Sequence, residues 1–149
     1  MITAIQELRK SIDDMTPEKQ SRIAVEINTS CPNIKDAPPP AYQPENLRPL
    51  LSVVAAAVRD DPTLTVGLKL PPYVYQTQFT DMIRFISSFT RDDRAKRTNP
   101  ISFFTCTNTL GSSLLFNSQT TNDQGEQTFA VPSKYGGLAG EALHPLALG

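Results

Sequence analysis

The sequence predicts an α/β fold built on a parallel sheet. Three short apolar runs typical of β-strands, at residues 23–28, 65–70 and 101–106, alternate with two segments of helical periodicity. The strands recur at intervals of about 40 residues, which leaves room for a crossover helix, and such crossovers join parallel strands. The expected order is therefore strand, helix, strand, helix, strand.

Three segments before and between these strands have the pattern of helices. Residues 2–14 repeat apolar side chains one turn apart. Residues 47–58 are apolar and rich in alanine, and Pro49 must lie in the first turn, where a missing N–H is tolerated. In residues 79–89, large apolar side chains recur every three or four positions.

After the third strand the pattern changes. Residues 114–118 and 127–131 alternate on either side of a polar turn that ends in Gly125, which predicts a β-hairpin. Residues 135–140 predict a glycine-rich loop, and residues 146–148 resemble the opening of another helix.

Length and composition predict one soluble domain over residues 1–149. The chain is 39% hydrophobic and 19% charged, with a formal net charge of −1, so no basic surface favours nucleic acid or an anionic membrane. No apolar run approaches the roughly 18 residues of a membrane span. The two cysteines lie far apart, and no metal-ligand spacing occurs. A cytoplasmic protein without membrane or nucleic-acid partners is expected.

Polar side chains follow each of the three predicted strands. Because the carboxyl ends of parallel strands open onto one edge of the sheet, these side chains are expected to meet there. They are two carboxamides and a thiol after the first strand, an ammonium in the second, and an amide and a hydroxyl after the third: Asn28, Cys31, Asn33, Lys69, Asn108 and Thr109.

The first of these groups places the Cys31 thiol between two carboxamides. A thiol there can accept a proton, and the amides of Asn28 and Asn33 can hold a flat, hydrogen-bonding ligand over it. The structural alternative is an ordinary turn, since Asn and Pro are common turn residues and a lone cysteine is usually a small buried side chain.

Lys69 stands between Leu68 and Leu70, in a strand that is otherwise apolar. A buried ammonium costs several kcal/mol unless an anion or strong acceptor pairs with it, so a functional role is favoured. The alternative is a lysine that extends its head group to solvent from an edge strand. Cys106, beside two phenylalanines, is expected to be a buried structural thiol.

Four stretches together resemble one known family. Residues 26–33, 67–73 and 136–140 and the Thr107-Asn108-Thr109 turn are similar to dihydroorotate dehydrogenase, in that family's order and with compatible spacing. The resemblance implies a (β/α)8 TIM barrel that holds flavin mononucleotide (FMN) at the carboxyl face of its strands. It also implies oxidation of dihydroorotate to orotate, a step of pyrimidine biosynthesis.

The resemblance also implies residue roles. Cys31 occupies the position of the base that takes a proton from the substrate. A cysteine at this position resembles the soluble members of the family. The stretch from Lys69 to Tyr73 resembles the homodimeric members that use fumarate. Lys69 would stabilise the negative charge of the reduced flavin. The remaining residues would hold the substrate (Asn28, Asn33, Asn108, Thr109) or the flavin (Asn28, Lys69, Thr107, Gly140).

A whole barrel needs about 250 residues, so these 149 supply about three strand–helix units plus the inserted hairpin. The expectation is a fragment of the full enzyme that does not hold FMN tightly by itself. Two alternatives stay open. One is an FMN domain similar to dihydropyrimidine dehydrogenase, against which Asn33 argues because those substrates lack a carboxylate. The other is a non-catalytic remnant that binds no flavin.

Overall fold

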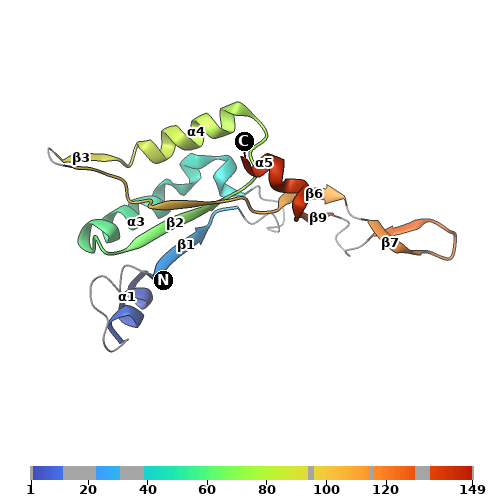
Figure 1. Cartoon of the computed structure of the whole chain (residues 1–149), viewed down its shortest axis with the longest axis horizontal. Helices are drawn as coiled ribbons and strands as arrows, with labels where there is room; N and C mark the ends of the chain where they lie inside the picture. Colours follow the sequence, from blue (N-terminus) through green and yellow to red (C-terminus); the bar gives the residue numbers. More distant parts are fainter. Residues whose placement is uncertain are drawn as a thin grey trace.

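A three-stranded parallel sheet forms the centre of the molecule. The computed structural model describes residues 2–11, 23–30, 39–93, 96–114, 116–129 and 135–148. The sheet has the order β1–β2–β5 with both pairs parallel, as Figure 1 shows. Its strands are β1 (Ala24–Asn28), β2 (Thr65–Leu70) and β5 (Phe103–Cys106). The predicted parallel α/β arrangement is confirmed.

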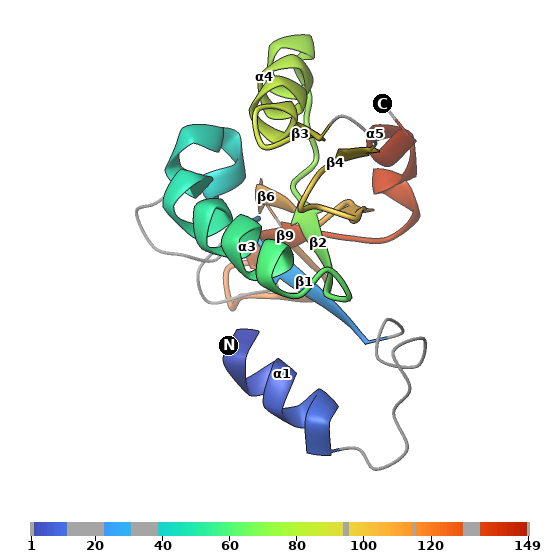
Figure 2. The ribbon, with the colours of Figure 1, turned by 90° about the vertical axis from the view of Figure 1, so that its left-hand side faces the viewer.

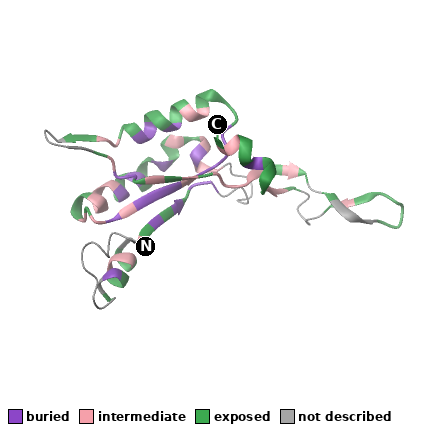
Figure 3. Ribbon diagram, in the orientation of Figure 1, coloured by how far each residue is buried: buried purple, intermediate pink, exposed green. Residues whose placement is uncertain are grey.

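The two crossover connections carry the helices α3 (Arg48–Asp60) and α4 (Gln76–Ser87), which cover one face of the sheet (Figures 1 and 2). Leu51 and Val54 of α3 are fully buried, as is Leu68 of β2 beneath them. Burial of such a side chain stabilises the fold by about 1.5–3 kcal/mol. The buried positions in Figure 3 accordingly gather where helices and sheet meet.

Local sequence sets where these helices begin. Two short 3-10 turns, Pro40–Tyr42 and Pro44–Leu47, lead into α3, and Pro49 lies in its first turn as expected. At the start of α4, the side-chain carbonyl of Gln78 accepts hydrogen bonds from the backbone N–H groups of Val74 and Tyr75 (2.9 and 3.1 Å). Such caps satisfy donors that would otherwise lack partners.

The other face of the sheet carries polar side chains. In β1 the burial alternates, so Val25 and Ile27 face the core while Glu26 and Asn28 are exposed. The register puts Glu26 beside Gly67, and the Phe103 ring fills the space where a Gly67 side chain would be. Across this face, the Thr105 hydroxyl donates a hydrogen bond to the Glu26 carboxylate.

Beyond β5 the chain forms two antiparallel pairs. β7 (Phe116–Thr121) pairs with β8 (Gln127–Phe129), which confirms the predicted hairpin, and this hairpin extends away from the sheet in Figure 1. β6 (Leu110–Leu114) pairs with β9 (Tyr135–Leu138). The predicted glycine-rich loop at 135–140 is therefore wrong over its first four residues. Gly137 lies so close to the Thr109 side chain that a β-carbon would collide with it, so the glycine there permits strand pairing.

The remaining elements flank this frame. A short hairpin of β3 (Arg91–Asp93) and β4 (Lys96–Thr98) follows α4 and was not predicted. The 3-10 turn Glu141–Leu143 leads into α5 (His144–Leu148), where a helix opening was expected. Within the part of the chain that the structure describes, no helix is both long and apolar enough to cross a bilayer.

The N-terminal helix α1 (Ile2–Ser11) is attached through Arg9, whose side chain is 2% exposed. Its guanidinium forms an ion pair with Asp61 (3.2 Å) and donates to the hydroxyl of Thr63. The Thr63 hydroxyl in turn donates to Asp61 and holds the pKa of that carboxyl below its ordinary value. These contacts fix α1 at the end of the sheet where β2 begins.

Candidate functional site

The carboxyl ends of β1 and β2 and the turn after β5 converge at one edge of the sheet. Asn28, Lys69 and Thr105 are aligned across the three strands. The backbone N–H of Asn108 donates to the carbonyl of Leu70 (2.8 Å), so the turn after β5 continues beside the end of β2. Three of the predicted site residues, Asn28, Lys69 and Asn108, thus lie together.

A hydrogen-bond network connects the two carboxamides at this edge. The Asn108 Nδ2 group lies 3.2 Å from Asn28 Oδ1, 3.0 Å from the Ser30 carbonyl and 3.1 Å from Ser30 Oγ. Asn28 Oδ1 also accepts from the backbone N–H of Ser30 (3.1 Å). The side chains of Asn28 and Asn108 therefore have defined positions before any ligand arrives.

The backbone carbonyl of Lys69 is a second centre of this network. It accepts hydrogen bonds from the Thr29 hydroxyl (2.8 Å), the Thr29 N–H (3.3 Å) and the Ser30 hydroxyl (3.1 Å). The Lys69 side chain is half-buried on the polar face, and no residue within the described ranges forms an ion pair with it. An ammonium at this position carries the charge that would stabilise an anionic ligand.

Cys31 and Asn33, which complete the predicted thiol-and-amide loop, lie outside the described residues. Their roles stay predictions. The network at Asn28 and Ser30 is the last described part of the chain before them.

Three further predicted residues line one cavity beside this edge. Thr107, Thr109 and Gly140 border a hollow of about 430 Å³ together with Glu141, Leu143 and His144. Gly140 has a φ of +90°, a conformation that residues with a side chain rarely adopt, and a β-carbon there would meet open space. Because no atom of the described residues, apart from its chain neighbours, lies within 4 Å of that position, a ligand can approach the Gly140 backbone.

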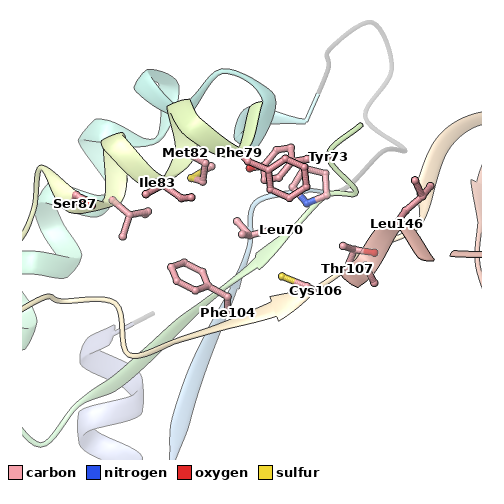
Figure 4. Close-up of a pocket in the computed structure, with 13 residues that line it drawn as sticks. Leu70, Tyr73, Phe79, Met82, Ile83, Ser87, Phe104, Cys106, Thr107 and Leu146 are labelled. Atoms are coloured by element: carbon pink, nitrogen blue, oxygen red, sulfur yellow. The ribbon is translucent and has the colours of Figure 1, made fainter. Parts of the chain in front are cut away.

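A second, apolar cavity of about 290 Å³ lies between α4, the ends of β2 and β5, and α5 (Figure 4). Phe79, Met82 and Ile83 of α4 form one wall, with Phe104 and Cys106 of β5 opposite. Cys106 is exposed, so the prediction of a buried structural thiol is wrong. It lies on the face of the sheet toward α4, but α4 and α5 leave this gap above it. Partial burial still raises the pKa of its thiol.

Sequence reasoning missed the residues that join the site together. Ser30 and Thr29 are 1% and 2% exposed, and their hydroxyls connect strand ends that lie about 40 residues apart in sequence. Both follow a strand directly, which was the available signal, but serine and threonine are common in turns. Among the described residues, no group of three or more potential metal ligands occurs.

Parallel strands, crossover helices and polar groups at the carboxyl ends of the strands define an α/β protein with a ligand site in the usual position for this architecture. The family model described as dihydroorotate dehydrogenase matches residues 3–149. The chain belongs to the dihydroorotate dehydrogenase family.

Similar curated proteins have names that include the word fumarate. A putative dihydroorotate dehydrogenase A (fumarate) of Streptococcus pyogenes is 30% identical over 83% of this chain and 33% of its own length. The dihydroorotate dehydrogenase (fumarate) of Trypanosoma cruzi is 29% identical over 90% of this chain and 38% of its length. The dihydroorotate dehydrogenase (fumarate) of Lachancea kluyveri is 30% identical over 83% of this chain and 33% of its own length. The chain spans about a third of the length of these relatives.

Proposed function

We propose that this chain provides part of the active site for FMN-dependent oxidation of dihydroorotate to orotate, with fumarate as the electron acceptor. Membership of the family and the names of the fumarate-type relatives support this reaction. In this proposal the parallel sheet and its helices are about three units of a (β/α)8 barrel. The same reasoning proposes a homodimeric, cytoplasmic enzyme.

The observation that carries the proposal is the junction of Asn28, Lys69 and Asn108 at one edge of the sheet. Orotate is flat and carries a carboxylate and ring carbonyls, which need N–H donors and a positive charge nearby. The Asn28 carboxamide is fixed by hydrogen bonds from Ser30 and Asn108, and the Lys69 ammonium has no ion-pair partner among the described residues. Groups positioned in advance bind such a ligand at a lower entropic cost.

The residues present fit a flavin. Thr107, Thr109 and Gly140 border one cavity at the strand ends, and the absence of a side chain at Gly140 leaves its backbone accessible. When bound, FMN supplies the acceptor for the hydride that leaves the substrate. In the proposal Thr107 and Gly140 contact the flavin, and Asn28 lies between flavin and substrate.

The chain's own residues have distinct tasks in this proposal. The Cys31 thiolate removes a proton from the substrate carbon adjacent to the one that loses hydride. A free thiol titrates near 8.5, so a modest decrease of the pKa makes it a competent base at neutral pH. Asn33, Asn108 and Thr109 orient the substrate, and Lys69 stabilises the negative charge that develops during the reaction.

The test is binding of orotate to the chain, measured by ligand-observed NMR, which detects weak complexes. Uracil is the matched control because it has the same ring without the carboxylate. Orotate is expected to bind, uracil is expected to bind much more weakly, and Lys69→Ala is expected to weaken orotate binding. Equal binding of uracil would favour a site similar to dihydropyrimidine dehydrogenase. Binding of neither ligand would contradict the proposal.

A further inference from the structure

The Ser30 hydroxyl lies at the centre of the strand-end network. The residue is 1% exposed, and Ser30 Oγ lies within hydrogen-bond distance of three groups from three parts of the chain. These are the Lys69 carbonyl in β2 (3.1 Å), Asn108 Nδ2 after β5 (3.1 Å) and Asn28 Oδ1 in β1 (3.3 Å). A serine hydroxyl has one proton to donate and can accept from others, so it can donate to Lys69 while accepting from Asn108.

The orientation of both carboxamides can be assigned because each faces a backbone N–H group, which donates a hydrogen bond and cannot accept one. The N–H of Ser30 donates to the side chain of Asn28 at 3.1 Å, so the atom facing it must be the oxygen. The N–H of Thr109 donates to the side chain of Asn108 at 2.8 Å, which fixes that oxygen in the same way. Asn108 Nδ2 must then point toward Ser30 and Asn28.

This arrangement leaves the Asn28 amide group directed away from the network. Its oxygen is occupied by Ser30 and Asn108, and no acceptor for Asn28 Nδ2 occurs among the described residues. Asn28 is exposed on the polar face of the sheet, beside Lys69 in the register. It therefore offers N–H donors to a ligand that accepts, such as a carbonyl or carboxylate.

We infer that Ser30 is a positioning residue of the site, whose buried hydroxyl adds to the hold of its own carbonyl on Asn108 Nδ2 and so helps to keep Asn28, which accepts from the same Nδ2, oriented as a donor toward the ligand. The inference rests on the proposed function for the identity of the ligand, but not for the network itself. Without the hydroxyl, Asn108 Nδ2 loses one acceptor, and both carboxamides gain freedom that a ligand must then remove.

Thr29 provides a matched control. It is 2% exposed, and its hydroxyl donates to the same Lys69 carbonyl (2.8 Å), but it forms no hydrogen bond with either carboxamide. Thr29→Val removes that hydroxyl with nearly unchanged shape, as Ser30→Ala does at the next residue. A purely structural role predicts similar consequences for the two substitutions, and a positioning role does not.

The experiment measures the side-chain amide signals of Asn28 and Asn108 by ¹⁵N NMR in the 149-residue chain, without ligand and with orotate. Ser30→Ala is expected to shift the side-chain amide signals of Asn108 part of the way toward those of an amide in water, because the Ser30 carbonyl still accepts from Nδ2. Thr29→Val and Ser30→Thr are expected to leave these signals in place. Loss of one net hydrogen bond predicts orotate binding about 3- to 10-fold weaker in Ser30→Ala alone.

Unchanged Asn108 signals in Ser30→Ala, or equal changes in Thr29→Val, would overturn the inference. If Ser30→Ala does not fold, Ser30→Thr decides. It keeps the hydroxyl, so Asn108 signals that stay in place support the inference, and signals shifted toward those of an amide in water overturn it. If orotate fails to bind the unmodified chain, the proposed function fails, and the ligand-free signals still decide the role of Ser30.

Discussion

At the scale of single residues, the site depends on short polar side chains whose positions are fixed by backbone groups. Asn28 and Asn108 accept hydrogen bonds from the N–H groups of Ser30 and Thr109. The Lys69 carbonyl accepts hydrogen bonds from hydroxyls at the neighbouring strand end. The chemical step in the proposed reaction requires one further residue, the Cys31 base.

Cys31→Ser tests that base. A serine hydroxyl is a far weaker acid than a thiol, so much less of the basic form is present at neutral pH, and dihydroorotate oxidation is expected to fall roughly 100-fold or more. FMN binding should change little. Both are measured in a protein that carries this chain with FMN bound, by the rate of flavin reduction and by flavin fluorescence. Unchanged turnover would reject Cys31 as the base.

Asp61→Asn tests the attachment of α1. The hydrogen bond from Thr63 lowers the pKa of Asp61, so the folded state favours the carboxylate. The stabilisation is therefore present above the unfolded value of about 3.9 and is lost as the pH falls through the lower folded pKa. Removing this hydrogen-bonded charge also takes away the ion-pair partner of Arg9. The substitution is expected to lower the free energy of unfolding by about 1–3 kcal/mol at pH 7.

The measurement is the free energy of unfolding by urea at several pH values, with Asp60→Asn as the control because Asp60 is exposed. The difference between Asp61→Asn and the unmodified chain should shrink as the pH decreases below about 4. A difference that is constant over this range, or equal in the Asp60 variant, would contradict the role of the ion pair.

At the scale of elements, those with a hydrophobic pattern were predictable from the sequence, and those held by backbone pairing alone were not. The alternation in β1 and the helical repeats in α3 and α4 set one face against another, so these elements were predictable to within a few residues. The β6–β9 pair was not predictable, because the glycines of β9 carry no hydrophobic pattern and β9 is separated from β6 in sequence by the β7–β8 hairpin. Residues at strand ends were predictable as a group, while the Ser30 and Thr29 contacts depend on tertiary distances.

Gly137→Ala tests the β6–β9 pair. The added β-carbon would collide with the Thr109 side chain, so the strands must separate, and a cost of about 1–3 kcal/mol is expected. Thr109→Gly should restore much of the loss in the double variant, because it removes the colliding atoms. Hydrogen-exchange protection of the β6 and β9 amides provides the measurement. Equal protection with and without the alanine would show that the close contact does not limit pairing.

At the scale of the whole molecule, stability and function occupy different faces of the same sheet. The helices α3 and α4 bury the apolar face, where the buried positions gather (Figure 3). The polar face and the strand ends carry the candidate site. The family resemblance alone implies that this sheet is part of a closed barrel. The sheet itself does not, because three strands and two crossovers are common to many α/β folds.

Leu51→Ala tests where the core lies. Leu51 is fully buried in α3, so its truncation is expected to cost about 2–5 kcal/mol. Leu50, the preceding residue in the same helix, is 39% exposed, and Leu50→Ala should cost much less. Urea unfolding of both variants compares them directly. Similar losses would mean that α3 does not pack against the sheet through this face.

The most direct test of the central claim is to locate bound orotate on the chain by ¹⁵N NMR. Saturable shifts are expected at Asn28, Lys69 and Asn108, with the largest at the Asn28 side-chain amide, and no comparable shifts are expected along α3 or the β3–β4 hairpin. Saturable shifts confined to another part of the molecule, or none at the strand ends, would contradict the central claim.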